Sequence, residues 1–126
     1  MPYTIKEVAE KYDLSVHTLR YYEKEGLLPF IERNKQGNRV FSNKDLEWLN
    51  IICCLKNTNM PIAKIKEYVD LCIEGPETIC KREEILLKHK KYIESEIDNF
   101  NSYLRVVDDK INHYIKKQKS IICKLG

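Results

Sequence analysis

The chain of 126 residues is 33% charged and 43% hydrophobic with only 4 Gly and 4 Pro, so it suits one helix-rich domain or a small domain with an appended helix. No run approaches the roughly 18 apolar residues that a membrane span needs, and no apolar signal core follows the N-terminus; we therefore expect a cytoplasmic protein with no membrane partner. The net charge is only +3, with 11 basic and 11 acidic residues in 1–74 and 11 and 8 in 75–126, so a nucleic-acid site has to be recognised from local patterns.

The start of the chain has the pattern of a helix-turn-helix. Thr4 and Glu7 stand at capping-box spacing and open a short amphipathic helix. Ser15 predicts the start of a second helix over residues 16–25, which ends at Gly26. Two short helices joined by a turn of three or four residues are typical of this motif.

The next segment predicts a β-hairpin, or wing, followed by two helices. In residues 29–42 the stretches FIER and RVFS flank the turn-forming sequence NKQGN. Ser42 is placed to cap a third helix over about 43–58. A fourth helix is expected over about 61–74, before Gly-Pro punctuation.

A long helix is predicted over residues 77–118, which contain no Gly or Pro. Apolar residues recur every seven positions, and both positions of the heptad seam are apolar from Ile93 to Tyr114. A helix of roughly 60 Å, at about 1.5 Å per residue, cannot bury such a stripe against so small a domain. We therefore expect a homodimer through residues 77–118. The fold class is mainly α, with domains at 1–75 and 76–118 and a short tail at 119–126.

Side chains suited to DNA gather in the winged segment. The N-terminal end of a recognition helix reaches base edges in the major groove, and guanidinium and phenol groups suit phosphate oxygens. Three cations within seven residues of the hairpin would add a compact backbone footprint. The expected base-reading residues are Val16, His17 and Thr18, and the expected phosphate contacts are Arg20, Tyr21, Tyr22, Arg33, Lys35 and Arg39.

The stretches LSVHTLRYYEKEGLLPF, R-x3-G-N-R-V-F-S and DLEWLNII together resemble the MerR family of bacterial transcription regulators. The similarity runs from Tyr3 to about Tyr114 with the elements in the family's order. It implies an antiparallel coiled-coil dimer that binds a palindromic promoter and distorts it so that RNA polymerase can engage both promoter elements.

The resemblance also implies roles for individual residues. Arg20 and Tyr22 match DNA-contacting positions of the recognition helix, and Arg39 matches the wing arginine that grips phosphate. Lys64 and Lys66 resemble a second wing that touches outlying phosphates. The family often has Tyr where Asn38 and Phe41 stand, so one wing contact is in question and one ring lacks its hydroxyl.

The five cysteines are an odd number without a C-x-x-C pair, so free thiols are expected rather than a disulfide scaffold. On a helical wheel Cys53 joins the apolar face of the third helix, where a thiol behaves as a small hydrophobe. Cys54 falls on the polar face, where a thiolate could form and react. Cys72 lies on the apolar stripe of the fourth helix and is expected in the core. No histidine is placed near Cys54 as a base, which argues against an enzyme.

Three effector hypotheses follow, and we expect no resident cofactor. The sequence WLNIICCLKNTNMPI followed by LCIEGPET is similar to the thiol- and aldehyde-stress branch of the family, the NmlR/AdhR-like regulators. That similarity implies that Cys54 is the sensor thiol for electrophiles such as formaldehyde. Alternatively, Cys80 and Cys123 of opposite subunits would bind a metal ion, or the protein has no cysteine-based effector.

Overall fold

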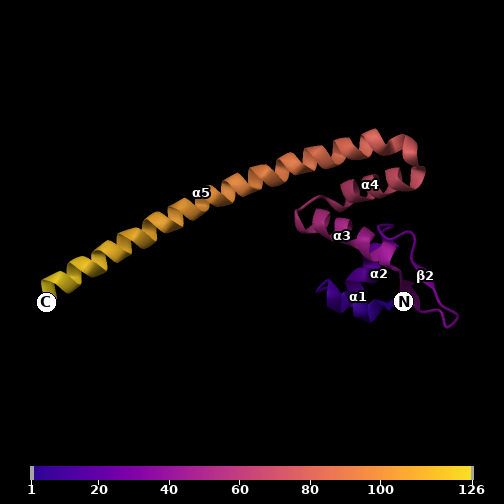
Figure 1. Ribbon diagram of the computed structural model, residues 1–126, viewed down its shortest axis with the longest axis horizontal. Helices are drawn as coiled ribbons and strands as arrows, with labels where there is room; N and C mark the ends of the chain where they lie inside the picture. Colours follow the sequence, from indigo (N-terminus) through magenta and orange to yellow (C-terminus); the bar gives the residue numbers. More distant parts are fainter. Residues whose placement is uncertain (1, 126) are drawn as a thin grey trace. The chain divides into compact units, whose positions relative to one another are not determined.

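The computed structural model describes residues 2–125, with side chains described up to residue 122 (Figure 1). The chain divides into two compact units, Met1–Ile85 and Leu86–Gly126. The elements, in chain order, are β1 (Tyr3–Thr4), α1 (Ile5–Lys11), α2 (Val16–Lys24), β2 (Glu32–Arg33), β3 (Arg39–Phe41), α3 (Asn43–Asn57), α4 (Ile62–Glu74), a 3-10 turn (Pro76–Thr78) and α5 (Ile79–Leu125).

The helix starts follow the predicted caps. At α1 the Thr4 side chain accepts from the backbone N–H of Glu7, and the Glu7 carboxylate accepts from the N–H of Thr4. Ser15 caps α2 through the N–H of Thr18, and Ser42 caps α3 in a second capping box. These bonds satisfy backbone donors that would otherwise lack a partner in the first turn. The helix-turn-helix and the two helices after the wing are confirmed within one or two residues.

The wing is a confirmed hairpin, but it belongs to a three-stranded antiparallel sheet in the order β1-β3-β2. Strand β1 was not predicted, because two residues are too few to show a strand's alternation. It pairs with β3 in the register Tyr3↔Phe41, whereas β2 pairs in the register Arg33↔Arg39. The hairpin turn contains Gly37 at φ 82°, a left-handed conformation that glycine adopts without strain.

The core of the first unit lies between the helix-turn-helix, the sheet and helices α3 and α4. Trp48 of α3 joins these elements: its indole N–H donates to the carbonyl of Leu27 at 2.8 Å, and its ring stacks on Tyr68 with centroids 6.3 Å apart. The Tyr12 hydroxyl donates to the carbonyl of Leu46 at 3.0 Å. Helix α3 therefore contacts both sides of the helix-turn-helix. The side chains buried most completely are Val8, Leu19, Leu27, Leu28, Phe41, Leu49, Ile52, Leu55, Ile65 and Val69.

The start of α5 packs with the first unit, so the compact unit extends beyond the boundary expected at residue 75. The Arg82 guanidinium donates to the carbonyl of Gly75 at 2.8 Å and to the hydroxyl of Thr78 at 3.0 Å. The buried Thr78 hydroxyl in turn donates to the carbonyl of Leu71 at 2.6 Å. These bonds tie the first turn of α5 to the end of α4, and Ile85 is buried with them.

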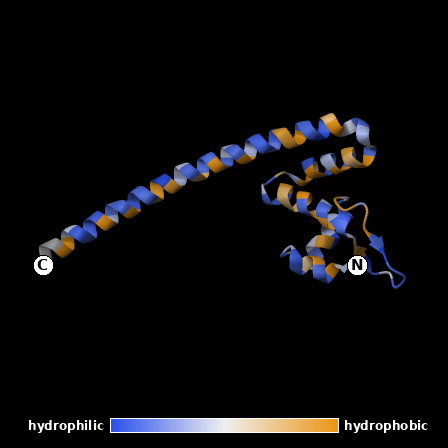
Figure 2. Cartoon of the chain, viewed as in Figure 1, coloured by the Kyte–Doolittle hydropathy of each residue, from blue (hydrophilic) through white to orange (hydrophobic). Residues whose placement is uncertain are grey.

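The long helix α5 is confirmed, but it continues past Gln118 to Leu125. Residues 119–125 therefore continue the helix. The prediction of a separate tail at 119–126 was wrong for these residues. No Gly or Pro interrupts the helix before that point. Figure 2 shows hydrophobic residues recurring along α5, and those of the seam from Ile97 to Tyr114 are exposed in the single chain. Within residues 2–125, no helix has the length and apolar character required to cross a membrane.

Candidate nucleic-acid interface

The three predicted base-reading residues in the first turn of α2 differ in the exposure of their side chains. His17 is exposed, whereas Val16 and Thr18 are half-buried. The hydroxyl of Thr18 lies 2.8 Å from the Ser15 hydroxyl, so it belongs to the N-terminal cap of the helix. Of the three, His17 has the side chain best placed to reach a base edge.

The neighbouring tyrosines of α2 point in different directions. Arg20 is exposed and Tyr21 is 43% exposed, but Tyr22 is 5% exposed and belongs to the core. Neighbouring residues on a helix point about 100° apart, so one of the pair faces inward when the other faces out. The expectation that Tyr22 offers its phenol to DNA is therefore corrected, and Tyr21 is the aromatic residue on the exposed face.

The wing arginine is held by an acidic residue that the sequence did not reveal. The Arg39 side chain forms a salt bridge with the Glu23 carboxylate of α2 through its Nε, and the two side chains are 20% and 23% exposed. Sixteen residues separate them, so no local pattern predicted the pair. The salt bridge fixes the orientation of the wing guanidinium relative to the recognition helix, and it leaves the two terminal nitrogens of Arg39 outside this contact.

A second arginine stands directly opposite Arg39 in the hairpin. Arg33 pairs with it across β2 and β3, and like charges in such a pair are destabilising. Glu23 offsets one of the two charges, and Arg33 donates to the carbonyl of Gly37 at 2.7 Å. Lys35 is exposed in the turn. The hairpin therefore has one cationic face, adjacent to α2, on which an anion would relieve the repulsion.

The two lysines of α4 are engaged in surface ion pairs. Lys64 lies 3.1 Å from the Glu67 carboxylate, and Lys66 lies 2.5 Å from the Asp70 carboxylate. Such exposed pairs contribute about 0–1 kcal/mol, so a phosphate could compete for either ammonium. Lys66 also packs beside Gly26, where an added Cβ would meet its Cε at 2.8 Å.

The adjacent thiols of α3 differ in exposure. Cys54 is exposed, as predicted, whereas Cys53 is half-buried and not fully in the core as expected. Burial, together with the neighbouring Cys54 thiol, raises the pKa of Cys53. Cys72 is also half-buried rather than fully in the core, with the Arg82 guanidinium 4.0 Å from its sulfur.

The structure describes the side chain of only one of the two cysteines of the metal hypothesis. Cys80 is exposed, and the Cys123 side chain lies outside the described residues. Among the described residues, no group of three or more His, Cys, Asp or Glu side chains could hold a metal ion.

The thiols should differ in their rates of alkylation. With N-ethylmaleimide at pH 7, the exposed Cys54 and Cys80 are expected to react at least about tenfold faster than Cys53, because Cys53 is half-buried and burial raises its pKa. The raised pKa should keep Cys53 protonated, and therefore slow, up to a higher pH than an ordinary thiol. Mass spectrometry of peptides over a time course measures each rate. Equal rates for Cys53 and Cys54 would contradict the burial difference.

The comparison with known proteins decides the family. A model of the MerR HTH family regulatory proteins matches residues 3–72, which include the helix-turn-helix, the wing and α3. The chain belongs to the MerR family. It is a DNA-binding transcription regulator rather than an enzyme, and its predicted fold class, mainly α with a winged helix-turn-helix and a long C-terminal helix, is confirmed.

Two relatives and one solved structure place this MerR regulator more closely. An uncharacterised HTH-type regulator of Haemophilus influenzae is 40% identical over 92% of this chain and 86% of that protein. AdhR of Bacillus subtilis is 36% identical over 69% of this chain and 62% of that protein. The crystal structure of HiNmlR, a MerR family regulator lacking the sensor domain and bound to promoter DNA, has a TM-score of 0.85 at 40% identity and 92% coverage of both chains.

Proposed function

We propose that this MerR regulator binds a palindromic promoter as a homodimer and activates transcription by distorting the DNA when an electrophile modifies Cys54. RNA polymerase would then engage the realigned promoter. The observation that carries the proposal is the exposed Cys54 thiol on α3, the helix that also anchors the helix-turn-helix. The overall similarity to AdhR and HiNmlR supports the same branch of the family.

Helix α3 would couple a modification of Cys54 to the helix-turn-helix. Cys54 lies six residues after Trp48, whose indole bonds to the loop that follows α2. Leu46, on the same helix, accepts the hydrogen bond from Tyr12 at the C-terminal cap of α1. An adduct that shifts or tilts α3 would therefore move the anchor points of both helices of the DNA-binding motif. The Cys54 thiolate would attack the carbonyl carbon of a reactive aldehyde. The C=O π bond would open as the S–C bond forms, and the resulting alkoxide oxygen would take a proton from water to give a hemithioacetal.

The proposed DNA surface combines the α2 face with the cationic face of the wing. His17, Arg20 and Tyr21 are exposed on α2, and the Glu23 salt bridge holds Arg39 beside this helix. The two lysines of α4 would extend the surface to outlying phosphates. The complete proposed set is Val16, His17, Thr18, Arg20, Tyr21, Arg33, Lys35, Arg39, Lys64 and Lys66.

Binding to the fragment upstream of the protein's own coding sequence tests this surface. Arg39→Gln is expected to weaken binding to all sequences alike and to reduce the slope of log K against log salt by about 0.9, because one phosphate contact is lost. Arg20→Ala should weaken binding as well. A gel shift at several salt concentrations measures both quantities.

Lys116→Gln, in the second unit, is the matched control because it removes one positive charge from an exposed position on α5. It should keep the wild-type salt slope. Failure of the wild-type protein to retard the fragment at low salt would contradict the proposal for this promoter, and an unchanged slope for Arg39→Gln would remove the wing from the interface.

A further inference from the structure

The hairpin of the wing has two chemically different faces. Alternate residues of a strand point to opposite faces, and paired residues share a face. Arg33 and Arg39 are paired and make the cationic face, whereas Glu32 is paired with Val40 on the other. The same hairpin therefore presents guanidinium groups on one side and a carboxylate beside an apolar side chain on the other.

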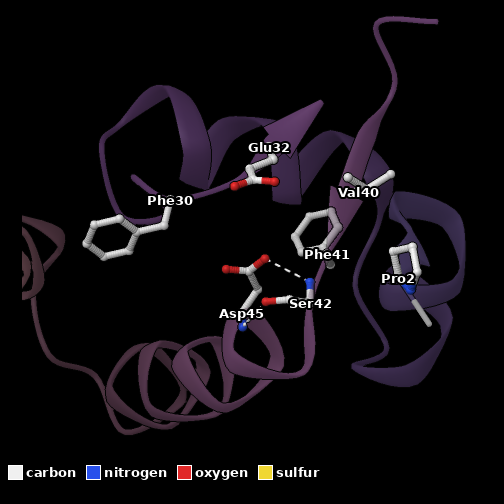
Figure 3. Close-up of a pocket in the computed structure, with 7 residues that line it drawn as sticks. All are labelled: Pro2, Phe30, Glu32, Val40, Phe41, Ser42 and Asp45. Atoms are coloured by element: carbon white, nitrogen blue, oxygen red, sulfur yellow. Dashed lines mark hydrogen bonds between the residues drawn. The ribbon is translucent and has the colours of Figure 1, made fainter. Parts of the chain in front are cut away.

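The face with Glu32 borders a small pocket (Figure 3). Its volume is about 170 Å³, below the roughly 300–1,000 Å³ of sites for small-molecule ligands. Figure 3 shows the carboxyl groups of Glu32 and Asp45 between the rings of Phe30 and Phe41. A pocket of this volume suits one long side chain rather than a metabolite. The lining residues are Pro2, Phe30, Glu32, Val40, Phe41, Ser42 and Asp45.

The lining combines negative charge with an exposed aromatic ring. Phe30 is 56% exposed although it is a large hydrophobic residue. Asp45 uses Oδ2 to accept from the Ser42 N–H at 2.8 Å, a bond that leaves Oδ1 uninvolved. A flat cation can stack on an aromatic face while it donates to carboxylates, and arginine does both better than lysine. Phosphate, in contrast, would be repelled by both carboxylates.

We propose that this pocket receives an arginine side chain of a protein bound to the same promoter. The inference rests on the proposed function: if the cationic face lies on phosphates, strand alternation turns the pocket face away from the duplex. The proposed function brings RNA polymerase holoenzyme to that promoter, so the holoenzyme is the partner to test. The wing would then contact DNA phosphates through its cationic face and an arginine of the polymerase through the opposite, acidic face.

The test compares cooperative binding of polymerase holoenzyme and regulator on the upstream promoter fragment. Glu32→Gln is expected to lower the cooperativity about threefold and Phe30→Ala with Glu32→Gln about tenfold, because a charge pair and a stacking contact are lost. Affinity of each variant for DNA alone should stay within about twofold of wild type, because neither residue is on the cationic face. Glu47→Gln is the matched control, since it removes one exposed carboxylate of α3 outside the pocket.

Three results would overturn the inference. Wild-type cooperativity in the double variant, or no cooperativity in the wild-type protein, would show that the pocket receives nothing from the polymerase. A change in the oligomeric state of Glu32→Gln by light scattering would assign the pocket to a second copy of the chain. Failure of the proposed function is distinguishable, because the wild-type regulator alone would then not bind the promoter fragment.

Discussion

Leu104→Asp combined with Val107→Asp is expected to convert the protein to a monomer and to lower its affinity for promoter DNA by at least about a hundredfold. Leu104 and Val107 are 57% and 53% exposed in the single chain, at adjacent seam positions of α5. Burying such a side chain contributes about 1.5–3 kcal/mol, and each substitution occurs twice in a dimer. The summed loss of about 6–12 kcal/mol is comparable to the roughly 8 kcal/mol that corresponds to a micromolar dissociation constant. A monomer would reach only one half-site of a palindrome.

Light scattering at micromolar concentration measures the mass, and a gel shift measures the affinity. Asn99→Asp combined with Asn112→Asp is the matched control, because it places two carboxylates at exposed positions of α5 outside the seam. The control should remain dimeric and bind DNA as the wild type does. A dimeric Leu104→Asp, Val107→Asp variant with unchanged affinity would disprove dimerisation through this seam.

Cys54→Ser is expected to abolish induction of the target promoter by formaldehyde or methylglyoxal while leaving promoter binding intact. The serine hydroxyl preserves the shape of the exposed side chain but is not a nucleophile at neutral pH unless a base activates it. A thiol, in contrast, provides some thiolate at neutral pH. A promoter reporter in cells exposed to aldehyde, to a diamide-type oxidant and to metal salts measures the response.

Cys80→Ser is the control for the loss of an exposed thiol elsewhere in the chain, and it should retain the response to aldehyde. Unchanged induction in Cys54→Ser, with loss in Cys80→Ser or Cys123→Ser, would instead favour the metal hypothesis. Protection of individual thiols against N-ethylmaleimide in aldehyde-treated protein, measured by mass spectrometry of peptides, would locate the modified residue independently.

The order of the elements was predictable because each of them depends on local signals. Caps at Thr4, Ser15 and Ser42 begin three of the helices, and each satisfies backbone donors only a few residues away. The heptad seam of α5 and the hairpin are likewise periodic patterns within one segment. The end of α5 was not predicted because the heptad seam ends at Tyr114 and its next position is the polar Gln118, although no Gly or Pro occurs between there and Leu125.

The candidate site was predicted less completely because its geometry depends on contacts between segments. The orientation of Tyr22 into the core could not be separated from that of Tyr21 by residue type alone. The Glu23–Arg39 pair joins α2 to β3, and strand β1 exists only because β3 lies beside it. The half-burial of Cys53 likewise reflects how closely its neighbours pack around α3.

By itself the sequence determined the family, the order of helices and wing, and the separation of Cys54 from Cys53 on the helical wheel, since all of these depend on residue types at short and regular spacing. Only the tertiary structure decided which tyrosine faces out, which acidic residue holds the wing arginine, and that the opposite face of the hairpin borders an acidic pocket. Long-range packing sets these features, because side-chain direction and salt-bridge partners depend on residues that are distant in the chain.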